Sequence, residues 1–147
     1  MSRVSQLLKS AHSEGDKVHT VSPGTLIVEA ARLLRDKQIG ALPVLEEGRL
    51  VGIISERDIT YKVTAEGIDP RTVTVAKFMV SEPAYVTPFS DIMDCMQLMK
   101  TKKSRHMPVL DEGKLVGIVS LRDIFHMLWK NQELLAMQME SYILGAR

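Results

Sequence analysis

Residues 42–59 read LPVLEEGRLVGIISERDI, and residues 107–124 read MPVLDEGKLVGIVSLRDI. The two stretches are identical at 13 of 18 positions and are related by an offset of 65 residues without a gap. The same offset relates Val21-Ser22-Pro23 to Val86-Thr87-Pro88, so the repetition extends upstream of both stretches. Agreement over this length indicates an internal duplication, which makes most of the chain two copies of one unit.

The duplication sets the expected domain organisation. We expect an N-terminal helical segment at 1–14, a first repeat at 15–66, a linker at 67–78, a second repeat at 79–130 and a C-terminal helix at 131–147. A unit of about 50 residues is small for independent stability. Two copies that pack sheet against sheet would share a core, and equivalent residues would then meet across a cleft near a pseudo-two-fold axis.

Each repeat predicts the order β-α-β-β-α, which is an α+β fold. Short strands are expected at 18–21 and 84–86, where Ser-Pro or Thr-Pro then ends the ladder. A helical pattern of apolar residues follows, then two apolar strands around a glycine-bearing hairpin loop, then a second helix after Ser55 or Ser120. Residues 124–144 predict one long helix, which would pack on its own domain or pair two chains.

Composition excludes several classes of protein. The 147 residues are 45% hydrophobic and 25% charged, with a formal net charge of +1, which is ordinary for a soluble globular protein and disfavours an electrostatic nucleic-acid binder. No apolar run could span a bilayer or serve as a secretory signal. The single cysteine, Cys95, excludes an internal disulfide and a Cys-based zinc site, and the four histidines lack metal-ligand spacing. We expect a cytoplasmic protein with no metal and no nucleic-acid or membrane partner.

The repeated polar residues Ser-x-Arg-Asp admit a structural interpretation. Ser-x-x-Asp at a helix start resembles a capping box, in which the serine oxygen accepts from a free N–H and the acid favours the positive end of the helix. That interpretation accounts for the serine and the aspartate. It does not account for Arg57 and Arg122, because arginine in the first turn opposes the helix dipole.

A functional interpretation uses the same residues. A helix N-terminus favours phosphate, and arginine adds forked donors for phosphate oxygens. Aspartate can accept hydrogen bonds from ribose hydroxyls, and the apolar strand before the motif offers a wall for a flat base. The order of these groups along the chain matches a nucleotide.

The two copies resemble a tandem pair of CBS domains, the family named after cystathionine β-synthase. The strand ending in Pro-Val-Leu, the Glu-Gly-x-Leu-Val-Gly-Ile hairpin and the Gly-Ile-x-Ser-x-x-Asp motif carry this resemblance, over about 110 of the 147 residues. It implies a pseudo-symmetric module with two clefts that bind adenosine-containing ligands such as AMP, ADP, ATP, NAD or S-adenosylmethionine. It also implies a regulatory rather than catalytic role and frequent homodimers.

The resemblance assigns roles residue by residue. In motif order, an apolar residue flanks the base, a serine contacts ribose or phosphate, an arginine faces phosphate and an aspartate holds ribose hydroxyls. These positions are Ile53, Ser55, Arg57 and Asp58 in the first repeat and Ile118, Ser120, Arg122 and Asp123 in the second. The early strands would contact adenine, and the stretches before the proline would line the clefts. These further positions are His19, Thr20, Ala84 and Tyr85, and Gly40, Ala41, Leu42, Arg105, His106 and Met107.

The two clefts should differ, because Gly40-Ala41 of the first repeat corresponds to Arg105-His106 of the second. We expect one site to bind tightly and the other weakly or not at all. One arginine in each motif suits one or two phosphates, which favours AMP or ADP over ATP and leaves NAD open. Lys100, Lys102 and Lys103 end a helix, where they stabilise its dipole or help to attract phosphate.

The sequence therefore predicts a stand-alone sensor of adenosine nucleotides that acts on an unknown regulated protein. The alternative is a ligand-independent dimerisation or scaffold module in which the motif residues only cap helices. Catalysis is not expected, because no histidine is repeated as a base and no Walker-type phosphate loop occurs.

Overall fold

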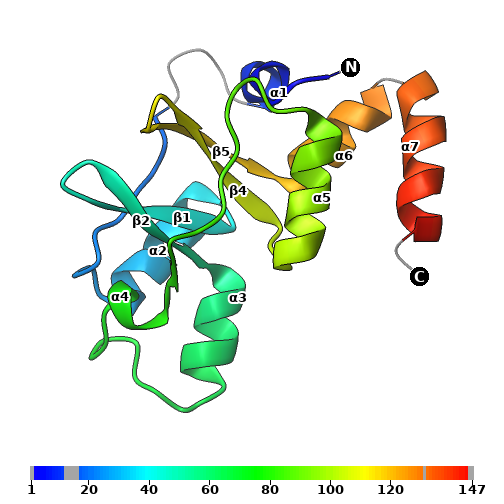
Figure 1. Cartoon of the computed structure of the whole chain (residues 1–147). Helices are drawn as coiled ribbons and strands as arrows, with labels where there is room; N and C mark the ends of the chain where they lie inside the picture. Colours follow the sequence, from blue (N-terminus) through cyan, green and yellow to red (C-terminus); the bar gives the residue numbers. More distant parts are fainter. Residues whose placement is uncertain (1, 12–16, 131, 146–147) are drawn as a thin grey trace.

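The computed structural model describes residues 2–11, 17–130 and 132–145 (Figure 1). Both repeats contain the same series of elements, as the duplication predicts. In the first repeat they are α2 (Ile27–Lys37), β1 (Ala41–Glu46), β2 (Arg49–Ser55), α3 (Glu56–Asp58) and the π-helix η1 (Ile59–Thr64). In the second they are α5 (Ile92–Lys102), β4 (His106–Asp111), β5 (Lys114–Ser120) and α6 (Leu121–Lys130). The predicted α+β architecture is confirmed.

The two β-hairpins are the most exact part of the duplication. Ala41 pairs with Ser55 in one hairpin and His106 with Ser120 in the other, and each ladder carries one irregularity at the equivalent place. Both turns have two central residues with positive φ, the second of which is Gly48 or Gly113. Such type I′ turns match the twist of the flanking strands, which is why glycine stands there.

The predicted strands at 18–21 and 84–86 are wrong as strands. Each is reduced to one parallel bridge, between Val21 and Val44 or between Val86 and Val109. The chain leaves the sheet at once, because Ser22-Pro23 and Thr87-Pro88 follow and proline donates no ladder hydrogen bond. The third strand of the first sheet is β3 (Val80–Ser81), which pairs antiparallel with β2.

The short helices that precede the repeats are exchanged between them. The linker helix α4 (Val75–Phe78) packs on the first repeat, where the amide of Val75 donates to the Thr25 carbonyl over 2.8 Å. The N-terminal helix α1 (Val4–Ala11) packs on the second repeat, where the amide of Val4 donates to the Ser90 carbonyl over 2.9 Å. Figure 1 shows α1 beside β5 and α6, far along the chain from its own position.

The buried residues form two clusters rather than the shared core expected from the sequence. The first joins Ile27, Leu42 and Ile54 of the first repeat to Val75 of the linker. The second joins residues of the second repeat to the N-terminal helix, whose Leu7 is fully buried. Each repeat covers its own sheet face because it receives a helix from the adjoining segment. The repeats still contact each other through β2 and β5.

The single long helix expected at 124–144 is also wrong. Helix α6 ends at Lys130, and α7 (Gln132–Gly145) turns back along it (Figure 1). The rings of Phe125 and Tyr142 lie 5.8 Å apart, edge to face, whereas in one straight helix 17 residues would separate them by about 25 Å. Among the described residues, no helix is long and apolar enough to cross a membrane.

Candidate functional site

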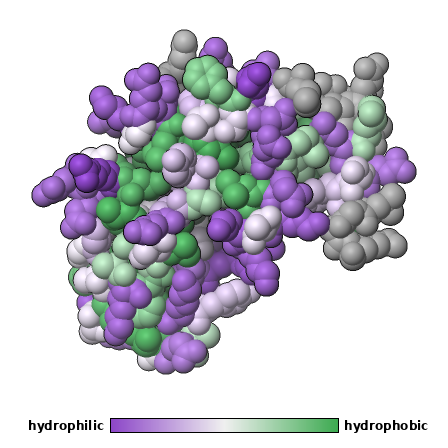
Figure 2. Space-filling view, viewed as in Figure 1, coloured by the Kyte–Doolittle hydropathy of each residue, from purple (hydrophilic) through white to green (hydrophobic). Residues whose placement is uncertain are grey.

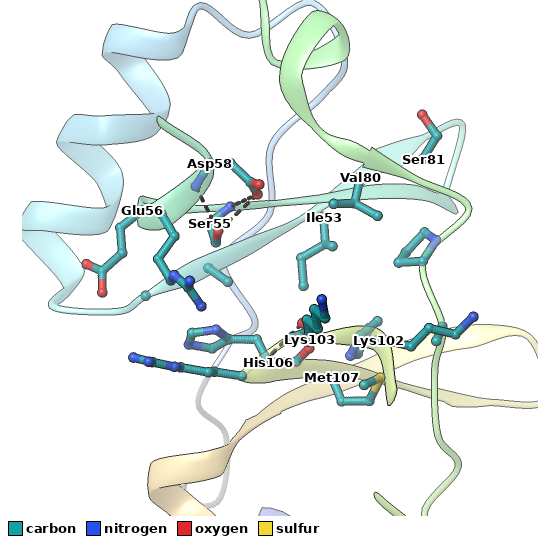
Figure 3. Close-up of a pocket in the computed structure, with 18 of the residues that line it drawn as sticks. Ile53, Ser55, Glu56, Asp58, Val80, Ser81, Lys102, Lys103, His106 and Met107 are labelled. Carbon is teal, nitrogen blue, oxygen red and sulfur yellow. Dashed lines mark hydrogen bonds between the residues drawn. The ribbon is translucent and has the colours of Figure 1, made fainter. Parts of the chain in front are cut away.

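A pocket of about 470 Å³ lies between the repeats and receives side chains from both (Figure 3). Its volume is within the range of about 300–1,000 Å³ that is typical of small-molecule sites. The first repeat supplies Gly40, Ala41, Ile53, Ser55, Glu56, Arg57, Asp58, Tyr61 and Lys62. The second repeat supplies Val80, Ser81, Glu82, Pro83, Ala84, Lys102, Lys103, Ser104, Arg105, His106, Met107 and Pro108.

The pocket has an apolar part, to which both repeats contribute. Ile53 comes from the middle of β2 and Met107 from the start of β4, on facing walls in Figure 3. Ala84 and Pro83 continue this surface along the segment that enters the second repeat. Figure 2 shows hydrophobic side chains gathered across the middle of the molecule as seen from this side, with hydrophilic side chains around much of its outline. A flat aromatic base could be buried against such a wall.

The first motif forms a complete capping box at the pocket wall. The Asp58 amide donates to Ser55 Oγ over 3.1 Å, while the Ser55 amide and hydroxyl both donate to Asp58 Oδ2 over 2.9 Å. Lys62 Nζ lies 3.0 Å from the other carboxylate oxygen of Asp58. The structural interpretation of Ser55 and Asp58 is therefore confirmed, and the same residues also line the pocket.

Asp58 retains little free capacity to accept hydrogen bonds. A carboxylate offers about four lone-pair positions, and three are occupied by the two Ser55 donors and Lys62. It can accept one hydroxyl as the side chains stand, rather than the two that the sequence suggested. A second hydroxyl would require Lys62 to move, which its exposed position at the rim permits.

Positive side chains dominate the polar part of the pocket. Five cations and three carboxylates line it, a formal net charge of +2 with His106 neutral. The cations are Arg57 and Lys62 on one wall and Lys102, Lys103 and Arg105 on the other. The Arg57 guanidinium also lies 5.5 Å from the centre of the Tyr61 ring. Cations on two facing walls favour an anionic ligand that reaches both repeats.

His106 lies at the contact between the repeats. Burial lowers the pKa of its imidazole from the ordinary value near 6.5, and neighbouring Arg105 lowers it further, while Glu56 and Asp123 oppose this effect. Neither ring nitrogen has a hydrogen-bond partner among the described residues. The ring is thus available to a ligand in the pocket.

The structure brings together ten of the residues that the sequence assigned to ligand binding. They are Gly40, Ala41, Ile53, Ser55, Arg57, Asp58, Ala84, Arg105, His106 and Met107. The other assigned residues do not line this pocket: His19, Thr20, Leu42, Tyr85, Ile118, Ser120, Arg122 and Asp123. In the second motif the Ser120 amide donates to Asp123 Oδ2 over 3.0 Å and the Asp123 amide to Ser120 Oγ over 3.0 Å, so this motif also forms reciprocal caps.

Sequence reasoning missed part of the lining. Lys102 and Lys103 were visible as a basic run, whereas Tyr61 and Lys62 lie on the π-helical turn that only the first repeat has. Residues 80–83 carry no recognisable motif in the sequence; they contain β3, which pairs with β2 of the first repeat. Among the described residues, no cluster of His, Cys, Asp and Glu could hold a metal ion.

Comparison with known proteins gives consistent results. A family model described as the CBS domain matches residues 14–64 and 75–130. A CBS domain-containing protein of Bacillus subtilis, YhcV, is 41% identical over 108 residues, which is 74% of this chain and 76% of the relative. A solved protein with CBS domains from Burkholderia ambifaria is 34% identical with a TM-score of 0.84 over 89% of this chain and 96% of that one. The solved complex of CBSX2 with AMP has a similar fold, with 24% identity and a TM-score of 0.71 over 88% of this chain and 98% of that one.

Proposed function

This chain belongs to the CBS domain family, and we propose that it is a regulatory module that binds an adenosine nucleotide in the pocket between its repeats. The observation that carries the proposal is the composition of that pocket. One volume of about 470 Å³ combines an apolar wall, an aspartate at a helix start and five cations from two facing walls. These are the three kinds of group that a base, a ribose and a phosphate require.

The proposed ligand lies with its base against Ile53 and Met107 and one ribose hydroxyl on Asp58. Its phosphate then faces Arg57 on one wall and the Lys102–Arg105 stretch on the other. We propose AMP first, because its phosphate carries about −1.5 to −2 charges at pH 7, which matches the formal charge of the lining. The AMP complex of CBSX2, which has a similar fold, supports this choice. ADP, ATP and NAD are the other members of the proposed ligand class.

The affinity should be moderate. A hydrogen bond to a charged group contributes roughly 1.5–3 kcal/mol, and a few of these with a buried base must offset about 4–15 kcal/mol of association cost. We therefore expect a Kd in the micromolar range, which corresponds to about −8 kcal/mol. Such a site would respond to changes in nucleotide concentration.

Regulation would follow from the position of the ligand. A nucleotide that contacts both walls favours one relative arrangement of the repeats, and a partner that prefers this arrangement then detects the nucleotide. By thermodynamic linkage the partner must strengthen nucleotide binding by the same factor. The homodimer, the absence of enzymatic activity and the cytoplasmic location expected from the sequence remain predictions within this proposal.

Mass spectrometry of the purified protein under non-denaturing conditions tests the proposal directly. It should detect a co-purified adenosine nucleotide and give the number of subunits. Thermal unfolding with added AMP, ADP, ATP or NAD is the complementary assay, because a ligand that binds only the folded state raises the midpoint. The proposal fails if none of the four nucleotides changes the midpoint at millimolar concentration.

A scaffold function is the second candidate, and the capping geometry favours it. Both motifs form reciprocal Ser–Asp caps, so these residues have a structural role without any ligand. Apolar side chains are also exposed on the C-terminal helices, among them Trp129 and Met137. Under this function, replacing Arg57 by Ala would leave assembly unchanged and there would be no nucleotide response to lose.

A further inference from the structure

His106 occupies the position at which the duplication breaks down most clearly. In the sequence repeat with its offset of 65, His106 of the second repeat corresponds to Ala41 of the first, and Arg105 corresponds to Gly40. In the structure the imidazole packs directly on Gly40, where an added Cβ would lie 2.7 Å from His106 Nε2 and 2.9 Å from Cε1. The ring therefore fills a space that only glycine leaves open, and it does so at the wall of the pocket.

The charged groups around this ring come from several elements. Helix α3 presents Glu56, whose Oε1 lies 3.6 Å from the same Cβ position on Gly40, and Arg57 lines the pocket beside it. Helix α6 contributes Asp123 at its start, and Arg105 immediately precedes β4, which begins at His106. The packed surface at Gly40 and at Ala41, the first residue of β1, contributes no charge. The ring nitrogens themselves have no partner among the described residues, so an anion in the pocket would be a new hydrogen-bond acceptor.

We propose that His106 couples nucleotide binding to proton uptake, so that the pocket binds a nucleotide phosphate more tightly when this imidazole is charged. This inference rests on the proposed function, because it needs an anionic ligand in the same pocket. In the empty pocket, burial favours the neutral ring, which is consistent with the lowered pKa of His106. A bound phosphate is a nearby opposite charge, which favours the charged ring and raises that pKa.

The direction of the pH dependence follows from linkage. If the ligand raises the pKa of His106, binding takes up a proton, and affinity rises as pH falls through the pKa of the complex. The effect is limited to about tenfold for each unit by which the pKa rises. The phosphate of AMP loses its second charge below about pH 6, which works in the opposite direction. The informative window is therefore about pH 6.5–8, where we expect affinity for AMP to be about three- to tenfold higher at the acidic end.

Calorimetric titration with AMP tests this coupling. Binding is measured at pH 7 in two buffers with different ionisation enthalpies, which gives the number of protons taken up, and again at pH 6.5 and 8 for the affinity. The wild type should take up a fraction of a proton. The variant His106→Gln should bind AMP without net uptake and lose the increase in affinity at the acidic end of the window. The variant His126→Gln, at an exposed residue outside the pocket, should behave as wild type.

The outcomes separate the two proposals. AMP binding without proton uptake, or with equal uptake in His106→Gln, overturns the coupling and leaves the nucleotide site intact. Failure of AMP, ADP, ATP and NAD to bind at any pH overturns both. If His106→Gln does not fold, the imidazole resonances of the wild-type protein answer the question, because AMP must then raise the pKa of one buried histidine. An unchanged pKa for every histidine overturns the coupling.

Discussion

The two motif aspartates provide a matched pair of mutations that separates helix capping from ligand binding. Asp58 and Asp123 each accept a hydrogen bond from the serine three residues before them, over 2.9 and 3.0 Å respectively. Only Asp58 lines the pocket. Replacing either by Ala removes one half of a capping box, at roughly 1 kcal/mol. Both variants should therefore unfold about 2–4 °C below wild type when no ligand is present.

Addition of AMP should separate the two variants. A ligand at 100 times its Kd stabilises the folded state by about 2.7 kcal/mol, which corresponds to about 5–11 °C for a chain of this size. Asp58→Ala removes one hydrogen bond to a charged group, at roughly 1.5–3 kcal/mol, which weakens binding about 10- to 150-fold. After a weakening of about 100-fold the ligand is only at its Kd, and it stabilises by about 0.4 kcal/mol, or roughly 1 °C.

Differential scanning fluorimetry of wild type, Asp58→Ala and Asp123→Ala, each with and without AMP, measures all of these shifts. In the absence of ligand we expect both variants to lose stability, Asp58→Ala somewhat more, because Asp58 also accepts from the Ser55 hydroxyl and pairs with Lys62. We expect a lost ligand response in Asp58→Ala alone. An unchanged response in Asp58→Ala would show that this carboxylate does not contact the nucleotide. An equal loss of response in both variants would refute the assignment of the site to the first motif.

Three further predictions concern the fold. Leu7→Ala should lower the free energy of unfolding by about 2–5 kcal/mol and increase amide exchange in the second repeat, because Leu7 is buried in that repeat's cluster. The control Lys9→Arg, at an exposed position of the same helix, should change the free energy of unfolding by less than about 0.5 kcal/mol. Gly48→Ala should lower the free energy of unfolding, measured in urea, by about 1–2 kcal/mol, because a side chain disfavours the φ of 76° even though no atom lies within 4 Å. The control Gly24→Ala, which is also in open space but has no positive φ, should leave the free energy of unfolding nearly unchanged. Burial raises the pKa of Cys95 to about 11, so its thiol should resist thiol reagents at pH 8 in the folded protein and react once urea unfolds it; fast reaction in buffer alone would contradict the buried assignment.

The duplicated part of the fold could be predicted from the sequence because its signals are local. The hairpins follow from apolar runs around Glu-Gly, and the repeat extends residue for residue into the strand register. Part of the first repeat's wall of the candidate pocket follows from the first motif, since Ile53, Ser55 and Asp58 are ordered along one strand end and the helix after it. Local patterns of this kind fix both the element and the side that each residue faces.

The remainder could not be predicted because it depends on contacts distant in sequence. No residue near Val4 or Val75 in the sequence indicates on which repeat helix α1 or α4 packs. The chain that follows α4 then runs past the first repeat, so residues 80–83 line the pocket. The prediction of one helix over residues 124–144 is wrong for a related reason. An apolar pattern from 124 to 144 fits one straight helix or two helices packed together, and only the contact of Phe125 with Tyr142 distinguishes them.

The crossed attachment of α1 and α4 has a mechanical consequence. A cut just ahead of α4 would leave each fragment without the helix that covers its core, so neither fragment should be obtainable as a well-folded protein. Tension applied ahead of α1 would be borne first by the latter half of the molecule, not by the half that adjoins it along the polypeptide. The crossed contacts of α1 and α4 therefore connect the two repeats mechanically. A small displacement of either helix should change the packing of both repeats.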